Sequence, residues 1–361
     1  MKIILATPLF PPEIEALSTY TKDLAEHLKN DHDIVVAAYA TRVEKMSGID
    51  ILKINKRRPL VVRLFNFTVK LFGASKGADV IYAQNAVAVG LPAIIVKSLK
   101  RIPVVINFAE DEAWKRAMSQ NLSNRSLVDF LKNECPDKKN HQIINLQGWV
   151  LKHATKVMVS SQAMADIVSE SYHVPKDKII VNYRPEDKVQ KLSLPVEVKK
   201  GQIFTTGRLV DWAGYDRLIQ AMTKLENAKL IIAGDGPARK GFEKLSKELG
   251  VEDRVKFLGQ ISRAENWHLR KTSQVYFANF SNNNFLRETS LSLLAGVPVI
   301  AFDTALAREI LSENLVDKNN LADKLKTLLE NSHTKSKLPE KFSWATHLNK
   351  LNSIFEGFIK K

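Results

Sequence analysis

The feature that most constrains the fold is a regular alternation of short apolar runs and helical patterns between Gly201 and Glu309. Each run is a candidate strand, and strands that alternate with helices in this way are typical of βαβ units and a parallel sheet. Ligands of parallel sheets bind at the carboxyl ends of the strands, so the residues that close the runs are candidates for a binding site. The runs are closed by Gly207, Gly234, Gly259, Asn279 and Asp303.

A similar alternation precedes this region. Apolar runs such as Lys2 to Leu9, Asp33 to Ala38 and Pro103 to Phe108 are separated by helical patterns. A chain of 361 residues exceeds one ordinary core, so the pattern predicts two α/β domains. The stretch from Tyr183 to Gly201 has no periodic apolar face, and we expect it to link the two domains.

Composition narrows the class of protein further. The single Cys135 excludes an internal disulfide framework, and the eight His residues show no metal-ligand spacing, so no metal site is expected. No signal pattern opens the sequence, and no run of about 18 apolar residues that could span a membrane occurs. We therefore expect a cytoplasmic protein.

The charge balance points to an anionic partner, because the formal net charge is +15 and the pI is near 9.6. Nucleic acid is not expected, since no helix-turn-helix, zinc-finger or aromatic RNA-binding signature is present. The segment 53–72 joins the basic run Lys53 to Arg58 to an apolar helical pattern with three Phe residues. Two interpretations remain open for this segment: a contact with an anionic membrane surface, or a helix that covers one face of a sheet.

Four segments carry a resemblance to a known family: Leu5 to Ile14, Gly207 to Met222, Ala233 to Pro237, and Phe257 to Ile261. Together they resemble glycosyltransferase family 4, whose members are retaining enzymes of the GT-B fold, and the likeness covers nearly the whole chain. The resemblance implies two Rossmann-like domains that face across a cleft. We expect them at 1–188 on the acceptor side and 189–341 on the nucleotide-sugar side, with a C-terminal helix at 342–361 that crosses back onto the first domain.

The resemblance also implies an activity. It predicts a hexosyltransferase-type enzyme that moves a sugar from a nucleoside diphosphate sugar to a hydroxyl of a saccharide or lipid-linked acceptor, without a metal or other cofactor. Such chemistry fits polysaccharide or cell-surface glycan synthesis by a protein that is peripheral on the inner membrane face. Two alternatives stay open: a catalytically degenerate pseudo-glycosyltransferase that serves as a partner or scaffold subunit, and a sugar-nucleotide epimerase of the same fold.

The resemblance assigns donor contacts to the second domain. Arg208 is the most specific of them, because a guanidinium at a glycine-closed strand end can hold two phosphate oxygens at once. Two acids are the catalytic candidates: Asp111, in an acidic trio that follows the strand beginning at Pro103, and Glu288. The trio could equally be an acidic helix start. The expected donor-binding residues are Gly207, Arg208, Gly236, Gln260, Ile261, Phe285 and Arg287.

Several positions depart from the family pattern. The glycine pair of the first loop becomes Glu15 and Ala16, a His becomes Ala109, and the donor-site Lys becomes Ala213. The two acids that precede the Gly296 turn become Asn283 and Leu291. A leucine cannot accept hydrogen bonds from sugar hydroxyls. Glu288 lies three residues before Leu291, on nearly the same helix face, and is the expected substitute.

Overall fold

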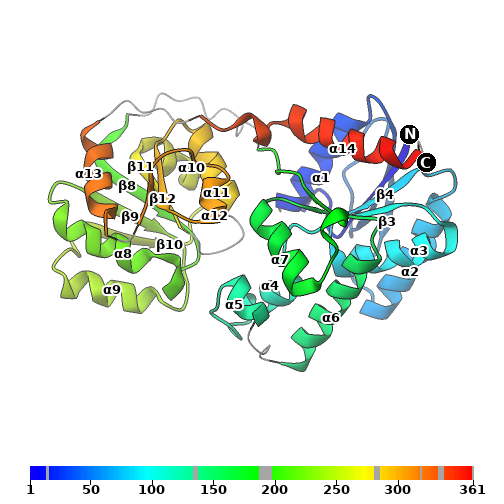
Figure 1. Cartoon of the computed structure of the whole chain (residues 1–361), viewed down its shortest axis with the longest axis horizontal. Coiled ribbons are helices and arrows are strands. Elements are labelled where there is room, and N and C mark those ends of the chain that lie inside the picture. The colour runs from blue at the N-terminus through cyan, green and yellow to red at the C-terminus, as the bar shows by residue number, and fades with distance from the viewer. Residues whose placement is uncertain are drawn as a thin grey trace. The chain divides into compact units, whose positions relative to one another are not determined.

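The computed structural model describes residues 1–13, 16–132, 137–186, 197–279, 285–317, 319–331 and 337–359 (Figure 1). The chain forms two compact units. The first consists of Met1–Ser123, Phe130–Tyr183 and Ala345–Lys361, and the second of Asn124–Asp129 and Arg184–Trp344. Glu15 and Asn283, two of the altered family positions, lie outside the described residues.

The first unit is built on a seven-stranded parallel sheet with the order β3-β2-β1-β4-β5-β6-β7. The internal strand β1 pairs on one side with β2 and on the other with β4, and its side chains from Ile3 to Ala6 have no exposed surface. Strands buried on both faces read as near-continuous apolar runs, which is why the sequence revealed them. The strands are β1 (Lys2–Thr7), β2 (Asp33–Tyr39), β3 (Asp50–Ile54), β4 (Val80–Ala83), β5 (Val104–Asn107), β6 (Lys156–Val159) and β7 (Ile179–Val181).

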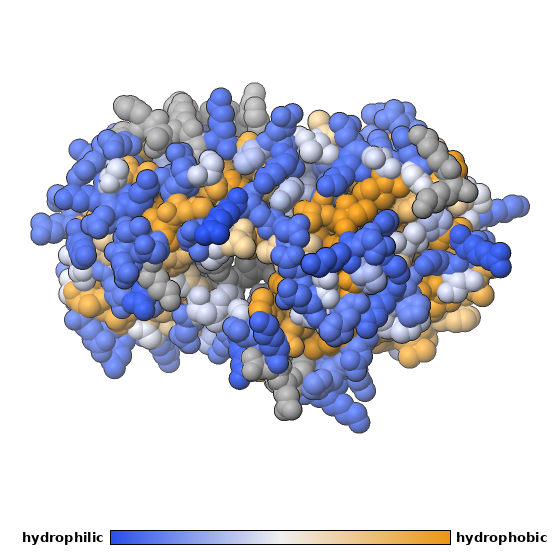
Figure 2. All heavy atoms as spheres, viewed as in Figure 1, coloured by the Kyte–Doolittle hydropathy of each residue, from blue (hydrophilic) through white to orange (hydrophobic). Residues whose placement is uncertain are grey.

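Helices connect these parallel strands. The helices and helical turns up to Lys178 are α1 (Ala16–Leu28), α2 (Leu60–Ala74), η1 (Ala86–Gly90), α3 (Leu91–Lys100), α4 (Glu112–Ser119), α5 (Leu127–Lys132), α6 (Lys138–His153), α7 (Gln162–Tyr172) and η2 (Lys176–Lys178). Most bury one apolar face. On the surface of this unit, hydrophobic residues also reach solvent over α2 and α3 (Figures 1 and 2).

The last helix of the chain, α14 (Trp344–Ile359), packs within the first unit. His347 is buried, and its imidazole lies between the Tyr20 hydroxyl at 2.8 Å and the Tyr183 carbonyl oxygen at 2.9 Å. Further along the helix, the ring of Phe355 meets that of Tyr82 at 6.0 Å. The apolar stripe of α14 is therefore part of the core of this unit.

The second unit contains a six-stranded parallel sheet with the order β10-β9-β8-β11-β12-β13. Chain order runs outward from β8 in both directions, so the sheet has a topological switch point between β8 and β11. Ligands of such sheets bind beside this point, at the carboxyl ends of the strands. The strands are β8 (Lys199–Thr206), β9 (Lys229–Ala233), β10 (Val255–Gly259), β11 (Ser273–Ala278), β12 (Val299–Phe302) and β13 (Leu315–Val316).

Its connecting helices complete an α/β domain, so the expected fold class of two parallel-sheet α/β domains is confirmed. The helices and turns are η3 (Asp211–Ala213), α8 (Tyr215–Ala221), η4 (Met222–Lys224), α9 (Arg239–Glu248), α10 (Arg263–Thr272), α11 (Phe285–Leu294), α12 (Ala305–Arg308), α13 (Leu321–Glu330) and η5 (Glu340–Phe342). Across the parts of the chain that the structure describes, no helix is long and apolar enough to cross a membrane.

Candidate functional site

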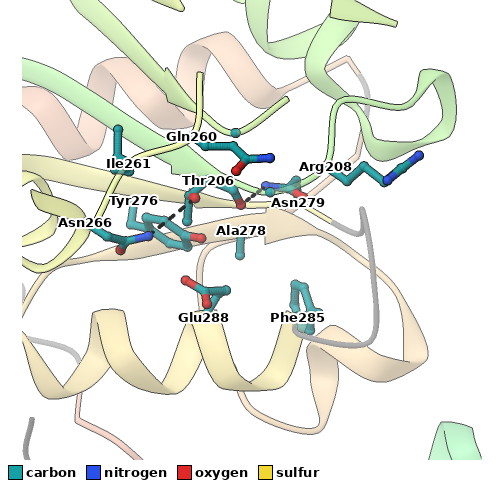
Figure 3. A pocket seen from close by; sticks show the side chains of 12 residues that line it. Thr206, Arg208, Gln260, Ile261, Asn266, Tyr276, Ala278, Asn279, Phe285 and Glu288 are labelled. Carbon is teal, nitrogen blue, oxygen red and sulfur yellow. Dashed lines mark hydrogen bonds between the residues drawn. The ribbon is translucent and has the colours of Figure 1, made fainter. Parts of the chain in front are cut away.

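A cavity of about 290 Å³ opens beside the switch point of the second sheet. It lies where β8, β9, β10 and β11 end, and one side of it is formed by the first turns of α11 (Figure 3). The lining residues are Thr206, Gly207, Arg208, Gly234, Gln260, Ile261, Asn266, Tyr276, Ala278, Asn279, Phe285 and Glu288. Six of the residues expected from sequence are thus brought together: Gly207, Arg208, Gln260, Ile261, Phe285 and Glu288.

Glycines let the backbone close tightly around this cavity. Gly234 has φ +120°, and a Cβ there would overlap the carbonyl group of Gly207. The Gly234 N–H donates to the Gly259 carbonyl at 2.7 Å, while the Gly207 N–H donates to the Ala233 carbonyl at 3.0 Å. Three strand ends are therefore fixed against one another, which gives the cavity a rigid backbone wall.

Gly236, an expected donor-binding residue, does not line the cavity. A Cβ at this position would overlap the backbone of Leu209, whose N–H donates to the Asp235 carbonyl at 3.1 Å. Glycine is therefore required here by close packing of two backbone segments. The neighbouring Gly234 lines the cavity. The sequence marked it as a strand-closing residue, but it was not among the expected donor-binding residues.

Arg208 follows Gly207 directly at the end of β8 and is half-buried. Its side chain extends away from Tyr276 and Glu288, toward the opposite side of the site (Figure 3). Among the described lining residues it is the one Lys or Arg, and Glu288 is the one Asp or Glu. The two charges therefore lie apart, which leaves one part of the site suited to an anion and another suited to hydroxyl donors.

Glu288 lies on α11 and is held by a buried arginine on α10. Its carboxylate Oε2 accepts a hydrogen bond from Nη2 of Arg270, a residue with no exposed surface. Arg270 also donates to the Asn266 side-chain oxygen at 2.9 Å, the Glu288 carbonyl at 2.7 Å and the Ser292 hydroxyl. The carboxylate is thus oriented by a guanidinium that is itself fixed by several acceptors.

The surroundings of Arg270 are aromatic as well as polar. Its guanidinium carbon lies 4.4 Å from the ring centre of Tyr276 and 5.9 Å from that of Phe204. Burial also raises the pKa of the Tyr276 hydroxyl, so this phenol stays neutral beside the charge. Arg270 was missed by sequence reasoning because it belongs to no motif, and only the packing of α10 against α11 reveals its partner.

Hydrogen bonds connect the end of β8 with Asn279, which follows β11, and with Asn266 on α10. Asn279 donates to the Thr205 hydroxyl at 3.0 Å and to the Thr206 carbonyl at 2.8 Å, and Asn266 donates to the Thr206 hydroxyl at 3.4 Å (Figure 3). Asn279 was marked from the sequence as a strand-closing residue, but none of these residues was among the expected donor contacts. The lining residues outside the expected donor-binding set are Thr206, Gly234, Asn266, Tyr276, Ala278 and Asn279, of which Gly234 and Asn279 were expected only as residues that close strands.

The remaining charged and altered positions of this unit lie off the cavity. Arg287 is 3.5 Å from a carboxylate oxygen of Glu186 and 3.5 Å from one of Glu288, and does not line the cavity. Ala213 has no exposed surface, and Leu291 is 8% exposed. Both therefore belong to the core. The positions where the family pattern has a Lys and an acid are therefore occupied here by the apolar residues Ala213 and Leu291. Glu288, one turn before Leu291 on α11, faces the cavity instead.

Asp111, the other expected catalytic acid, lies in the first unit, where it is buried. It has no exposed surface and caps α4 by accepting the Trp114 N–H at 2.9 Å. The second carboxylate oxygen accepts from Gln147 at 3.2 Å and from the Tyr172 hydroxyl. Burial raises the pKa of Asp111, and these donors partly offset the effect. The other interpretation, an acidic helix start, fits the capping.

Its neighbour Glu112 also has a raised pKa. Burial raises the pKa of Glu112 to about 7, although the Val87 N–H donates to its carboxylate at 3.2 Å. The third acid, Glu110, is paired with Lys115 at 2.7 Å. Ala109, where relatives have a His, lies half-buried in the loop after β5. Ala16, the described member of the altered glycine pair, opens α1.

Metal-ligating residues do not gather in the described ranges, where no group of three His, Cys, Asp or Glu side chains is placed to hold an ion. The chemistry that the cavity can support is therefore recognition by one arginine, backbone amides, side-chain amides and one carboxylate.

Two family descriptions match the chain in tandem. Residues 16–185 match the glycosyl transferase 4-like domain, and residues 187–346 match glycosyl transferases group 1. The two matches together span nearly the whole chain and divide it close to the boundary between the two compact units.

Relatives and solved structures agree with these matches. The chain is 24% identical over 344 residues to an uncharacterized glycosyltransferase of Methanocaldococcus jannaschii, covering 87% of this chain and 84% of the relative. It is 22% identical to the alpha-monoglucosyldiacylglycerol synthase of Streptococcus pneumoniae, covering 87% and 74%. The crystal structure of Anabaena HepE in complex with UDP superposes with a TM-score of 0.67 and 17% identity, over 99% of this chain and 100% of that one. The GT-B fold expected from the resemblance is confirmed.

Proposed function

The chain belongs to the glycosyltransferases in which a glycosyl transferase 4-like domain precedes a glycosyl transferases group 1 domain, and on that premise we propose that it moves a hexosyl group from a nucleoside diphosphate sugar to a hydroxyl acceptor. The cavity of the second unit binds the donor. The single observation that carries this proposal is the position of the cavity, at the switch point of a parallel sheet, with Arg208 at a strand end that backbone packing makes rigid.

In this proposal Arg208 and backbone amides hold the diphosphate. A guanidinium presents two parallel N–H groups to two oxygens, and it loses its charge at no physiological pH. Because the diphosphate gains negative charge as the sugar departs, a fixed cation at this point stabilises the transition state more than the bound donor. The transfer needs no metal in this scheme, since the chain supplies the cation itself.

Glu288 recognises hydroxyl groups of the donor. Its carboxylate is an acceptor only, and Arg270 fixes its orientation from behind, so hydroxyls of a sugar or ribose are the donors that fit it. Gln260 and Ile261 line the cavity across from Glu288 (Figure 3), where backbone groups after β10 can read a base. Support for a UDP-type donor comes from HepE, which was crystallised with UDP.

The acceptor is a saccharide or a lipid-linked saccharide in cell-surface glycan synthesis. Support comes from one relative, which is named alpha-monoglucosyldiacylglycerol synthase. Glu112, whose pKa of about 7 lets it exchange a proton near neutrality, is the acid of the first unit best suited to assist an acceptor hydroxyl.

The test is a thermal shift assay with UDP, GDP and their sugars. A ligand at about 100 times its dissociation constant stabilises the folded protein by about 2.7 kcal/mol, so the correct nucleotide is expected to raise the melting temperature measurably. Arg208→Ala is expected to abolish the rise. The matched control is Arg217→Ala, because Arg217 interacts with Asp216 and Gln220 outside the cavity.

A donor that shifts the wild type is then assayed for release of nucleoside diphosphate. A shift that persists in Arg208→Ala would contradict the assignment of the diphosphate site. No shift with any nucleotide would contradict donor binding altogether and favour the partner or scaffold alternative.

A further inference from the structure

Helix α2 has two apolar faces, and the sheet covers one of them. Phe67 and Leu71 are fully buried, and the Phe67 ring packs 4.8 Å from that of Tyr39 on β2. This contact confirms that α2 covers the sheet, as one sequence interpretation expected. The opposite face contains a second set of large apolar side chains that this packing does not use.

The second face is a regular helical stripe. Val61, Phe65, Val69 and Phe72 follow one another at spacings of four, four and three, and they are 77%, 67%, 53% and 41% exposed. Exposed apolar residues scattered singly need no explanation, but a contiguous stripe on one helix marks an interaction surface. Folding alone does not account for two Phe side chains held in water.

Helix α3 extends the stripe. Leu99 is 66% exposed, Ile95 is 38% exposed, and they are four residues apart on a helix that packs beside α2. Lys100, at the end of α3, has its ammonium 4.0 Å from the ring centre of Phe72 and 2.6 Å from the Phe72 carbonyl oxygen. The two helices therefore present one surface, defined by the six exposed residues Val61, Phe65, Val69, Phe72, Ile95 and Leu99 and called the α2–α3 face below.

The chain segment that contains α2 and α3 is strongly basic, although Lys56 within it is paired with Glu13. Between Ile51 and Ala109 the sequence contains ten Lys and Arg residues, and the one acid is Asp79. That carboxylate accepts the backbone N–H of Lys2 at 2.7 Å. Arg57 and Arg58 are exposed immediately before α2, and Arg101 is exposed immediately after α3. An apolar stripe with a basic margin is complementary to an anionic, partly apolar surface.

We propose that the α2–α3 face docks onto an anionic lipid membrane surface, with the apolar stripe inserted at the level of the headgroups and the basic margin against the lipid phosphates. A second copy of this chain would bring the same positive charges together, and that repulsion disfavours it as the occupant. Docking of this kind places the first unit at the bilayer surface and does not depend on the donor chemistry of the second unit.

The first experiment measures binding of the full chain to vesicles by cosedimentation. Binding is expected to phosphatidylcholine vesicles that contain phosphatidylglycerol, and to be much weaker with phosphatidylcholine alone. Added salt is expected to reduce it, because the Debye length falls from about 10 Å at 0.1 M to about 3 Å at 1 M. Equal binding to both vesicle types, or no binding to either, would overturn the proposal.

The second experiment separates the stripe from general hydrophobicity. The double variant Val61→Ser/Phe65→Ser is expected to lower the vesicle partition coefficient by about tenfold or more, since exposed side chains can be removed without disturbing the core. The matched control, Val198→Ser/Ile359→Ser, removes side chains that are 53% and 52% exposed elsewhere. An equal loss in both double variants would refute a role for the stripe.

The basic margin is tested in the same way. Arg57→Ser/Arg58→Ser is expected to weaken binding to the anionic vesicles at low salt, whereas Lys244→Ser/Lys247→Ser, which removes two exposed charges from α9, is expected to leave it nearly unchanged. Sedimentation velocity without lipid measures whether a second copy of this chain occupies the α2–α3 face instead. If Val61→Ser/Phe65→Ser dissociates a dimer while vesicle binding is retained, the face is a self-association surface and the proposal is wrong.

Discussion

The pair formed by Arg270 and Glu288 predicts a large loss of stability when the carboxylate is removed. In Glu288→Ala, the guanidinium of Arg270 keeps its charge and has no exposed surface through which water could solvate it. Its remaining acceptors are neutral: the Asn266 side-chain oxygen, the Ser292 hydroxyl and the carbonyl of residue 288. These can hydrogen-bond the cation but cannot neutralise it.

Removing one partner of a buried ion pair typically costs about 3–5 kcal/mol. The Glu288 side chain is 20% exposed toward the cavity and that of Arg270 is 1% exposed, so water that enters the space left by the carboxylate reaches one side of the guanidinium. We therefore expect the lower end, about 3 kcal/mol. For a domain of this size that corresponds to a fall in melting temperature on the order of 10 °C.

The assay is a double-mutant cycle followed by urea unfolding, with Trp267 on α10 as a local fluorescence reporter. Arg270→Met/Glu288→Leu is expected to be more stable than Glu288→Ala, because apolar replacement of both charges removes the unpaired one. Asp303→Ala is the control for an exposed pair. Its partner is Arg308, at 2.7 Å, and we expect the unfolding midpoint to change little.

The same cycle separates stability from function. The double replacement restores stability but lacks the carboxylate, so it is expected to bind the donor more weakly than the wild type. A cost for Glu288→Ala below about 1 kcal/mol, or a double variant no more stable than that single variant, would refute the reasoning that the pair is buried and mutually dependent.

Further predictions concern Gly234, Glu112 and Asp111. Gly234→Ala is expected to cost about 1–3 kcal/mol and to abolish the nucleotide thermal shift, because Gly234 has φ +120° and a Cβ there would overlap the Gly207 carbonyl. The control is Gly241→Ala in α9, whose Cβ would meet no atom within 4 Å and which should stabilise the helix slightly. Since burial raises the pKa of Glu112 from 4.5 to about 7, the free energy of unfolding should fall as pH rises across that interval, and Glu112→Gln should flatten the slope in urea titrations at several pH values. Asp111→Ala should destabilise the protein by about 1–3 kcal/mol, because the α4 cap and two further hydrogen bonds are lost. Nucleotide affinity measured by titration calorimetry should stay unchanged. A loss of sugar transfer without a loss of stability would instead support a catalytic role for Asp111.

Local sequence signals located much of the fold and part of the site. Strands such as β1 and β11 are buried on both faces, so their apolar composition marks them without any tertiary information. Gly207 and Gly234 close such strands, and Arg208 follows one of them, which predicted where a ligand would approach. This succeeded because the carboxyl ends of parallel strands meet at one edge of a sheet.

Contacts between distant residues could not be derived in this way. Asp111 was predicted to face an acceptor because acids at a strand end are often functional, but Tyr172 and Gln147, which bury it, come from α7 and α6. The exposed stripe of α2 could not be derived from the sequence for the same reason. Helical periodicity shows that α2 is apolar on two faces, and only the packing of Phe67 against β2 shows which face remains open.

The sequence by itself determined that the chain forms two parallel α/β domains and that their glycine-closed strand ends can receive an anion, because both properties follow from the local order of apolar, helical and glycine residues. Only the tertiary structure decided that Glu288 is held by Arg270, that Gly236 packs against Leu209 instead of lining the cavity, and that Asp111 is buried. The physical reason is that burial and charge pairing depend on which elements meet in space, and no local pattern specifies the partner that another helix will supply.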